Sequence, residues 1–288
     1  MLKKILNLSE QLTHARLSEV CESSGATVYS KVRLADILPI DNSGVSSIEY
    51  SFALRSHLDF VVANSETLPL FAVEFDGPTH TSIKQKERDS IKDRLCKKFE
   101  LPLLRITSDY LTKNYRNTDL LSWLVDVYFM QEDFDRQQQA GTIPFDEVFD
   151  PLAIIVSDGK EGKFPYWLSA PLQVQLRKLQ QQEKCSDPVC YHILGLDQND
   201  NLYGLGWIHV TETLVVSATM SLKGQNFFVI LMDLLDQLLV YELYEEVTKF
   251  LNGSIPGMSL DELKKRTANF KQRYRTISSL TRGSLEDY

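Results

Sequence analysis

The chain has 288 residues, of which 43% are hydrophobic and 24% charged, as in ordinary globular proteins of one large or two ordinary domains. Its net charge of −8 argues against non-specific coating of nucleic acid, although a local basic surface can still bind phosphates. No apolar run reaches the roughly 18 residues that span a bilayer, and the first residues do not resemble a signal peptide. We therefore expect no membrane interaction. The four cysteines are scattered along the chain, which favours a reduced, cytoplasmic setting.

The first elements predict a helix followed by a strand. Residues 5–23 have helical character and end at a Ser-Ser-Gly stop. Residues 27–38 predict a strand with Lys31 and Arg33 on one face. These two cations could meet a phosphate backbone, and the alternative is an ordinary solvated strand face.

Two apolar runs, 57–63 and 70–75, predict strands joined by a short, turn-like segment, as in a β-hairpin. Asp59 lies on the first strand, and Glu74 and Asp76 share one face at the end of the second, because side chains alternate along a strand. Clustered carboxylates repel one another unless a proton or a cation neutralises them. An all-oxygen site of this kind suits Mg²⁺ or Mn²⁺.

The helix predicted after this hairpin places three cations on its apolar stripe, namely Lys84, Arg88 and Lys92. Inward cations beside clustered carboxylates are costly unless they pair or take part in chemistry. The other charges of this segment are typical of pairing on a helix surface. Upstream, Arg55 and His57 precede the Asp59 strand and could reach a substrate.

Residues 101–106 predict a buried strand, and a strand, a helix and a strand in succession imply a right-handed parallel crossover. We therefore expect an α/β domain, residues 1–130, with a mixed sheet flanked by helices. An acidic, polar linker is predicted at 131–150. A smaller α+β domain follows at 151–288, and it could select substrate or contact a protein partner or a second copy.

In the second domain, the long apolar helix at 227–251 is expected to lie in the core or at an oligomer contact. Cys185, Cys190 and His192 are zinc-ligand types, but their spacing is not a common zinc pattern. The basic segment at 264–275 has interleaved aromatic residues and predicts either nucleic-acid binding or a solvated terminal helix.

The motifs of the first domain resemble the PD-(D/E)XK, or restriction-endonuclease-like, nuclease superfamily. The branch that they resemble has Glu-x-Asp-Gly with a nearby His and is similar to very-short-patch-repair endonucleases. The resemblance covers roughly residues 10–125. It rests on Val32-Arg-Leu-Ala-Asp36, Asp59-Phe-Val-Val, Ala72-Val-Glu74-Phe-Asp76-Gly77-x-x-His80, Arg88-Asp89-x-x-Lys92-Asp93 and Leu101-Pro-Leu-Leu-Arg105-Ile106.

This resemblance implies a Mg²⁺- or Mn²⁺-dependent endonuclease that hydrolyses phosphodiester bonds, with DNA as the expected substrate. Asp59 and Glu74 would hold the metal, and the Phe75 carbonyl could be a third ligand. The chain departs from the usual motif at Asp76, which stands where the catalytic lysine is expected. In some branches a lysine from the next helix replaces it, and Lys92 is the candidate here.

The resemblance also implies supporting roles. Lys84 is the second candidate for the lysine, and His80 would act as a base or contact phosphate, while Asp76 would bind metal or orient His80. An N-terminal glutamate sometimes completes such sites, and we expect Glu19 rather than Glu10 or Glu22. The residues expected to contact nucleic acid are Lys84, Arg88, Arg55, Lys31 and Arg33.

The missing lysine at position 76 leaves an alternative open. In that alternative the domain is a nuclease-like fold without cleavage that binds nucleic acid or protein, for instance within a defence or mobile-element complex.

Overall fold

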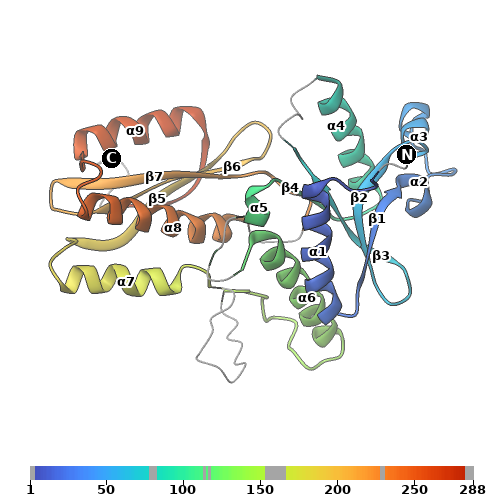
Figure 1. The fold of residues 1–288 in the computed structure, drawn as a ribbon, viewed down its shortest axis with the longest axis horizontal. Coiled ribbons are helices and arrows are strands. Elements are labelled where there is room, and N and C mark those ends of the chain that lie inside the picture. The colour runs from blue at the N-terminus through green and yellow to red at the C-terminus, as the bar shows by residue number, and fades with distance from the viewer. Residues whose placement is uncertain are drawn as a thin grey trace. The chain divides into compact units, whose positions relative to one another are not determined.

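A computed structural model describes residues 4–77, 83–112, 115, 118–152, 167–227 and 231–282, with side chains from Gln85 onward in the second of these ranges. The chain divides into two compact units (Figure 1). Unit 1 comprises Met1–Pro151 and Gln225–Val229, and unit 2 comprises Leu152–Gly224 and Ile230–Tyr288.

Unit 1 contains a mixed four-stranded sheet in the order β1-β2-β3-β4, in which only the β3–β4 pair is parallel. This arrangement confirms the predicted hairpin and the predicted parallel crossover. Its described elements are, in chain order, α1 (Leu8–Ser23), β1 (Thr27–Arg33), α2 (Leu34–Ile37), α3 (Ser47–Ala53), β2 (His57–Ala63), β3 (Pro69–Phe75), α4 (Ile83–Lys98), β4 (Leu103–Ile106), α5 (Asp109–Thr112) and α6 (Leu120–Gln139).

Helices cover both faces of this sheet, as expected for an α/β domain. On one face, Leu95 and Cys96 of α4 pack in a cluster with Val61, Ala72 and Leu103 of the strands. The opposite face is covered by α1 and α6, which pack along each other (Figure 1). Since Asp59 and Glu74 alternate in phase with Val61 and Ala72, both carboxylates lie on the face covered by α4.

A segment far along the chain extends unit 1 beside β4. The Leu103 amide donates to the carbonyl of Asn226 at 2.7 Å. The side-chain amide of Gln225 binds both the N–H and the C=O of Arg105, each at 2.8 Å. The Phe227 ring lies against the aromatic rings of α6 and β3 in the same unit. Residues 225–227 therefore satisfy backbone groups at this edge of the sheet.

Several boundaries differ from the sequence expectations. Helix α1 begins at Leu8 and not at residue 5, with Asn7 as its cap, and Phe227, expected in the long helix of the second domain, packs in unit 1. The first strand ends at Arg33, because Leu34 is fully buried and begins the short helix α2. Helix α6 continues to Gln139, into the predicted linker. Side-chain hydrogen bonds one turn apart stabilise this polar end of α6, from Gln131 to Asp135 and from Gln137 to Asp133.

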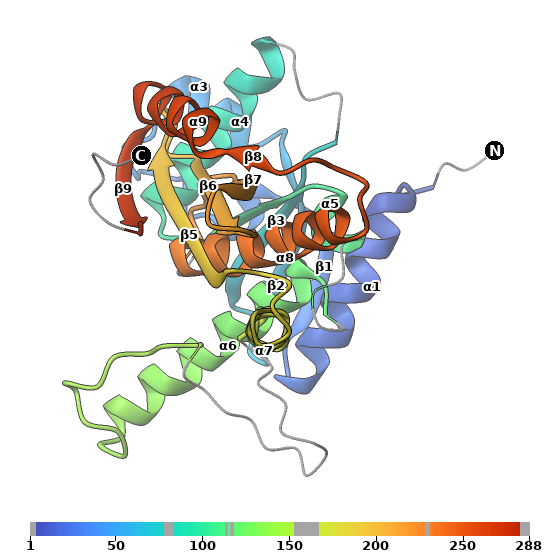
Figure 2. The same cartoon turned by 90° about the vertical axis from the view of Figure 1, so that its left-hand side faces the viewer.

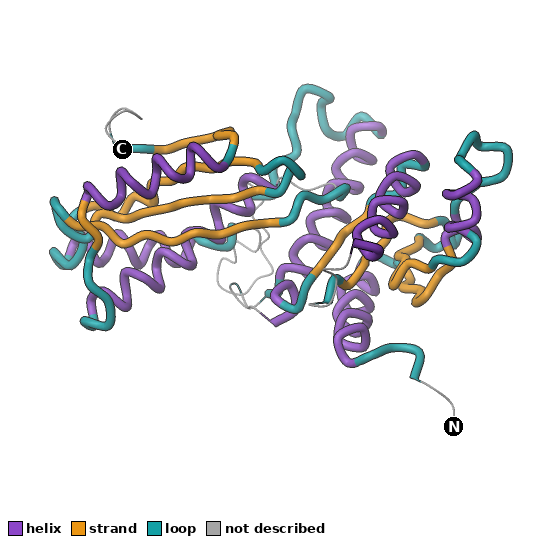
Figure 3. The backbone as a smooth tube through the Cα atoms, turned by 90° about the horizontal axis from the view of Figure 1, so that it is seen from above, coloured by secondary structure: helices purple, strands orange, loops and turns teal. Residues whose placement is uncertain are grey.

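Unit 2 contains an antiparallel five-stranded sheet in the order β8-β7-β6-β5-β9, and Figure 3 shows its long strands side by side. The described elements are α7 (Ala170–Gln181), β5 (Asp187–Leu196), β6 (Leu202–His209), β7 (Leu214–Leu222), α8 (Leu231–Leu251), β8 (Met258–Ser259), α9 (Leu260–Arg273) and β9 (Arg275–Leu280). Figures 1 and 2 show α8 and α9 on opposite faces of this sheet.

The long helix α8 packs closely on β6 because that strand carries glycines. A Cβ atom at Gly204 would lie 2.6 Å from Leu239, and one at Gly206 would lie 2.9 Å from Leu243. The predicted apolar helix is thus in the core of unit 2. Among the described helices, none combines the length and apolarity that crossing a membrane requires.

Candidate functional site

The hairpin brings Asp59 and Glu74 into direct contact. The Asp59 amide donates to Glu74 Oε1 at 3.0 Å, and the Phe75 amide donates to Asp59 Oδ2, also at 3.0 Å. The register explains this contact. Phe60 pairs with Val73 in an antiparallel arrangement, so Asp59 lies opposite Glu74. Each carboxylate is thus oriented by a backbone amide, with one oxygen left for another partner.

Lys92 reaches this pair from α4. Its Nζ atom lies 2.6 Å from Glu74 Oε2 and donates to the His57 carbonyl at 3.0 Å. Both side chains of the ion pair are buried. Burial raises the pKa of Glu74, and the Asp59 charge adds to this shift, while the Lys92 charge opposes it. Lys92 therefore places an ammonium group beside the carboxylate pair from the helix that follows the hairpin, as the sequence predicts.

Lys31 also contacts the carboxylates, through an unusual backbone conformation. Its φ of 56° is left-handed, although it lies within β1 between the paired residues Ser30 and Val32. The Nζ atom lies 2.6 Å from Asp59 Oδ1 and 2.7 Å from Glu10 Oε1. A left-handed non-glycine residue costs about 1–3 kcal/mol, which the two ion pairs offset. Burial lowers the pKa of Lys31, but its hydrogen bonds to these carboxylates outweigh burial and raise it.

The position of Lys31 corrects the prediction that it contacts a phosphate backbone from an open strand face, because carboxylates hold its ammonium group. The companion expectation, that Lys31 and Arg33 share this face, fails because the left-handed residue breaks the alternation. Arg33 is exposed and pairs with Asp36 at 2.5 Å.

Glu10, and not Glu19, is the glutamate of α1 that reaches the site. Its Oε2 atom accepts from the Asn7 amide at 2.8 Å in a capping box, while its Oε1 atom binds Lys31. Glu19 is exposed and pairs with Arg16 at 3.2 Å on the helix surface. The Asn-x-x-Glu spacing was visible in the sequence and would have identified Glu10 as the ordered side chain at the start of α1.

Asp76 belongs to a neighbouring cluster around Arg105 on β4. The guanidinium of this buried arginine lies 3.2 Å from Asp76, 2.8 Å from Asp93 and 3.5 Å from Asp89. Burial lowers the pKa of Arg105, but the carboxylates of Asp93, Asp76 and Glu74 outweigh burial and raise the pKa. Asp76 thus has Arg105 as its ion-pair partner, and this differs from the expected three-carboxylate cluster. The candidate residues had not included Arg105.

Two further candidates, Arg88 and Arg55, have partners other than the carboxylate pair. Arg88 was expected to point inward, but it is exposed above the Phe52 ring, 5.8 Å from its centroid, because the buried side of α4 runs through Lys92 and Leu95. Arg55 is exposed and donates to the Ser51 carbonyl. His80 and the side chain of Lys84 lie outside the described residues.

A cavity of about 750 Å³ opens onto the carboxylate pair. The three carboxylates of Glu10, Asp59 and Glu74 are matched by three ammonium groups, because Lys31 and Lys92 pair with them and Lys4 also lines the cavity. The chemistry of this donor set suits a hard cation held by two carboxylates, because all the donors are oxygen atoms. No group of three or more metal-ligating side chains is assembled within the described ranges. Residues lining the cavity include Glu10, Asp59, Glu74, Phe75, Gln85 and Lys92.

The cysteines of unit 2 are free thiols. Cys185 donates to the His209 carbonyl at 3.2 Å, and His192 pairs with Asp236 at 2.9 Å. Burial raises the pKa of Cys190 to about 12. These contacts account for the three residue types that had raised the zinc alternative.

Comparison with known proteins gives one match. Residues 2–120, which include the whole carboxylate site, match the family described as "Protein of unknown function (DUF2726)". No curated protein and no solved structure matches the chain.

Proposed function

We propose that unit 1 is a metal-dependent nuclease that hydrolyses phosphodiester bonds, with DNA as its substrate. The observation that supports this proposal is the contact of Asp59 with Glu74 beside the buried ammonium group of Lys92, at the wall of an open cavity. Two adjacent carboxylates can hold a divalent ion, and a lysine beside them can stabilise the negative charge that develops on a phosphodiester during hydrolysis. The resemblance to PD-(D/E)XK nucleases involves these same residues.

In this mechanism Asp59 and Glu74 would hold a Mg²⁺ or Mn²⁺ ion, and the Phe75 carbonyl would be the candidate third ligand. When bound, the ion lowers the pKa of a water molecule and offsets charge on the scissile phosphate. The amides of Asp59 and Phe75 keep both carboxylates oriented before substrate arrives.

Lys92 supplies a fixed positive charge. Its contacts with Glu74 and the His57 carbonyl hold the ammonium group in place, so little reorganisation is needed when negative charge develops on the phosphate. Lys31 restrains Asp59 and Glu10 and reduces the repulsion that three carboxylates would exert on a polyanion.

The test compares wild type with Asp59→Asn, Glu74→Gln and Lys92→Met on plasmid, linear and single-stranded DNA and on RNA, in Mg²⁺, Mn²⁺ or EDTA. Both carboxylate variants should fall to the rate in EDTA, and Lys92→Met should lose about 10²–10³-fold. Matched controls are Glu66→Gln and Lys86→Met, which change exposed residues that do not line the cavity. Cleavage that survives all three site variants, or no cleavage with either metal, would contradict the proposal.

A second candidate function is a nuclease-like module that binds nucleic acid or a protein without cutting. The two lysines favour it. Each lies 2.6 Å from a carboxylate oxygen, and these ion pairs neutralise Asp59 and Glu74 without a metal ion. The presence of Asp76 at the position of the usual catalytic lysine also favours this function without cleavage. Binding of equal strength in Mg²⁺ and EDTA, with intact substrate throughout, would favour this second function.

A further inference from the structure

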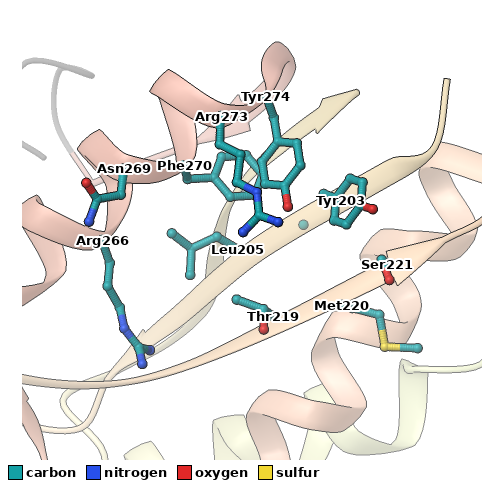
Figure 4. A pocket seen from close by; sticks show the side chains of 11 residues that line it. Tyr203, Leu205, Thr219, Met220, Ser221, Arg266, Asn269, Phe270, Arg273 and Tyr274 are labelled. Atoms are coloured by element: carbon teal, nitrogen blue, oxygen red, sulfur yellow. The ribbon is translucent and has the colours of Figure 1, made fainter. Parts of the chain in front are cut away.

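Unit 2 contains a pocket between α9 and the sheet, remote in sequence from the carboxylate site. Its volume is about 430 Å³ (Figure 4). Strands β6 and β7 form its floor, and Figure 4 shows the arginine side chains of α9 directed toward these strands. The lining residues that matter here are Tyr203, Arg266, Asn269, Phe270, Arg273 and Tyr274.

The sequence of α9 explains how these side chains reach the pocket. Ser259 caps the start of the helix, because its side chain accepts from the Glu262 amide. The helix buries Leu263, Thr267 and Phe270. Arg266 and Arg273 are seven residues apart, so both flank this buried stripe and lie about 10 Å apart along the helix axis. The basic and aromatic pattern of the tail therefore lines a pocket, and the helix that carries it is docked on the sheet.

One wall of the pocket is a group of aromatic rings. The rings of Tyr203 and Tyr274 are stacked with centroids 4.2 Å apart, and Phe270 lies 4.8 Å from Tyr274. This packing requires a glycine on β5, because a Cβ atom at Gly195 would lie 2.9 Å from Tyr274 Cβ and 3.2 Å from the Arg275 carbonyl. Because Arg273 lies over the Tyr274 ring, a base would continue this stack from the outer face of Tyr203, and stacking of this kind accepts the planar ring of any base.

The other wall is cationic. Arg266 donates to the Ser217 hydroxyl at 2.5 Å, and the Arg273 guanidinium lies 5.3 Å above the Tyr274 ring. Among the described residues, neither arginine forms an ion pair with a carboxylate, although the chain as a whole is acidic. A planar guanidinium binds phosphate oxygens in pairs, and Asn269 adds a donor and an acceptor that can meet a base edge.

We propose that this pocket binds an unpaired nucleotide, with its base stacked on the Tyr203–Tyr274 wall and its phosphate bound by Arg266 and Arg273. A free nucleotide has the same base and phosphate, so the test distinguishes these two sources. The proposal concerns unit 2 and does not depend on cleavage at the carboxylate site.

The experiment measures fluorescence anisotropy of a labelled 12-nucleotide single strand with the full chain in EDTA, which prevents metal-dependent cleavage. Competitors are the unlabelled strand, its duplex, a mononucleotide and a glutamate-rich peptide of matched charge. The variants are Tyr203→Leu, Tyr203→Phe and Arg273→Gln, with Arg275→Gln as the control. Arg275 is exposed on β9 and does not line the pocket, so its variant removes the same charge nearby.

We expect Tyr203→Leu to weaken binding about tenfold and Tyr203→Phe to retain it, since stacking needs the ring and not the hydroxyl. Arg273→Gln should reduce the slope of log K against log salt by about 0.7, whereas Arg275→Gln should leave it unchanged. Arg273 is exposed, so this variant remains informative if Tyr203→Leu fails to fold.

Competition by the single strand assigns a strand as ligand, and competition by the mononucleotide alone assigns a free nucleotide; both support the pocket. The proposal is overturned if no nucleotide binds, if binding ignores Tyr203 and Arg273, or if the acidic peptide competes as well as the strand. Loss of cleavage in Asp59→Asn with unchanged binding would separate this site from the one in unit 1.

Discussion

Replacing Lys92 by Met tests the buried ion pair on which the candidate site depends. Lys92 Nζ lies 2.6 Å from Glu74 Oε2, and the two side chains are only 11% and 8% exposed. Methionine preserves most of the apolar stem but leaves the Glu74 carboxylate and the His57 carbonyl without this donor. Removing one partner of a buried pair costs about 3–5 kcal/mol, and we expect a loss of that size in unit 1.

The loss should depend on pH in a defined direction. Burial already raises the pKa of Glu74 against the opposing charge of Lys92, so the variant should raise it further. A carboxyl group with a raised pKa in the folded state binds its proton more tightly there than in the unfolded state. The destabilisation should therefore be smallest at low pH and grow as pH rises from the folded-state pKa of Glu74 in wild type to the higher one in the variant.

The assay measures unfolding in urea, with hydrogen exchange of the β2 and β3 amides as the readout. Because both strands belong to unit 1, this readout reports on unit 1 alone. The control Lys86→Met changes an exposed lysine of the same helix and should stay within about 0.5 kcal/mol of wild type. The double variant Glu74→Gln with Lys92→Met should recover most of the loss. If Lys92→Met behaves like the control, or the double variant is no better than the single one, the pairing argument is refuted.

Three further expectations follow from other contacts. Gln225→Ala removes both hydrogen bonds to the Arg105 backbone and should destabilise unit 1 by about 1–3 kcal/mol, measured by faster exchange in β4; Asn226→Ala, which keeps its backbone bridge, should have a smaller effect. His209 is 2% exposed, its ring nitrogens have no hydrogen-bond partner in the described part of the chain, and burial lowers its pKa below 6.5, with Arg282 adding to the shift. The unfolded state then binds the proton first, so stability should fall as pH drops below 6.5, and thermal melts of His209→Phe should lack this component. Burial raises the pKa of the fully buried Cys96 thiol to about 12, so iodoacetamide at pH 8 should leave it unmodified, by mass spectrometry, until urea unfolds unit 1.

Much of unit 1 could be predicted because its signals are local. Apolar runs on either side of a short turn produce the hairpin, and the turn is closed by the Asn64 side chain, which accepts from the amides of Glu66 and Leu68. Once that hairpin forms, strand alternation places Asp59 and Glu74 on one face. The helical period of α4 then brings Lys92 to them.

Other features of the site depend on contacts that no local pattern encodes. Lys31 has a left-handed backbone conformation, and its ammonium group binds Glu10 and Asp59, which both lie far from it in sequence. Whether Asp76 joins the carboxylate pair was decided by Arg105 on the next strand. Helical periodicity placed Arg88 inward, whereas in the structure it is exposed over the Phe52 ring.

The sequence by itself determined the α/β layout of unit 1, the adjacency of two carboxylates and the basic, aromatic pattern of the tail, because periodicity and turn chemistry act over a few residues. Tertiary structure alone decided that residues 225–227 extend the sheet of unit 1 and that the tail closes a pocket over β6 and β7. Such arrangements arise when buried backbone groups and apolar faces are satisfied by distant segments, and the order of residues along the chain does not specify which segment will do so.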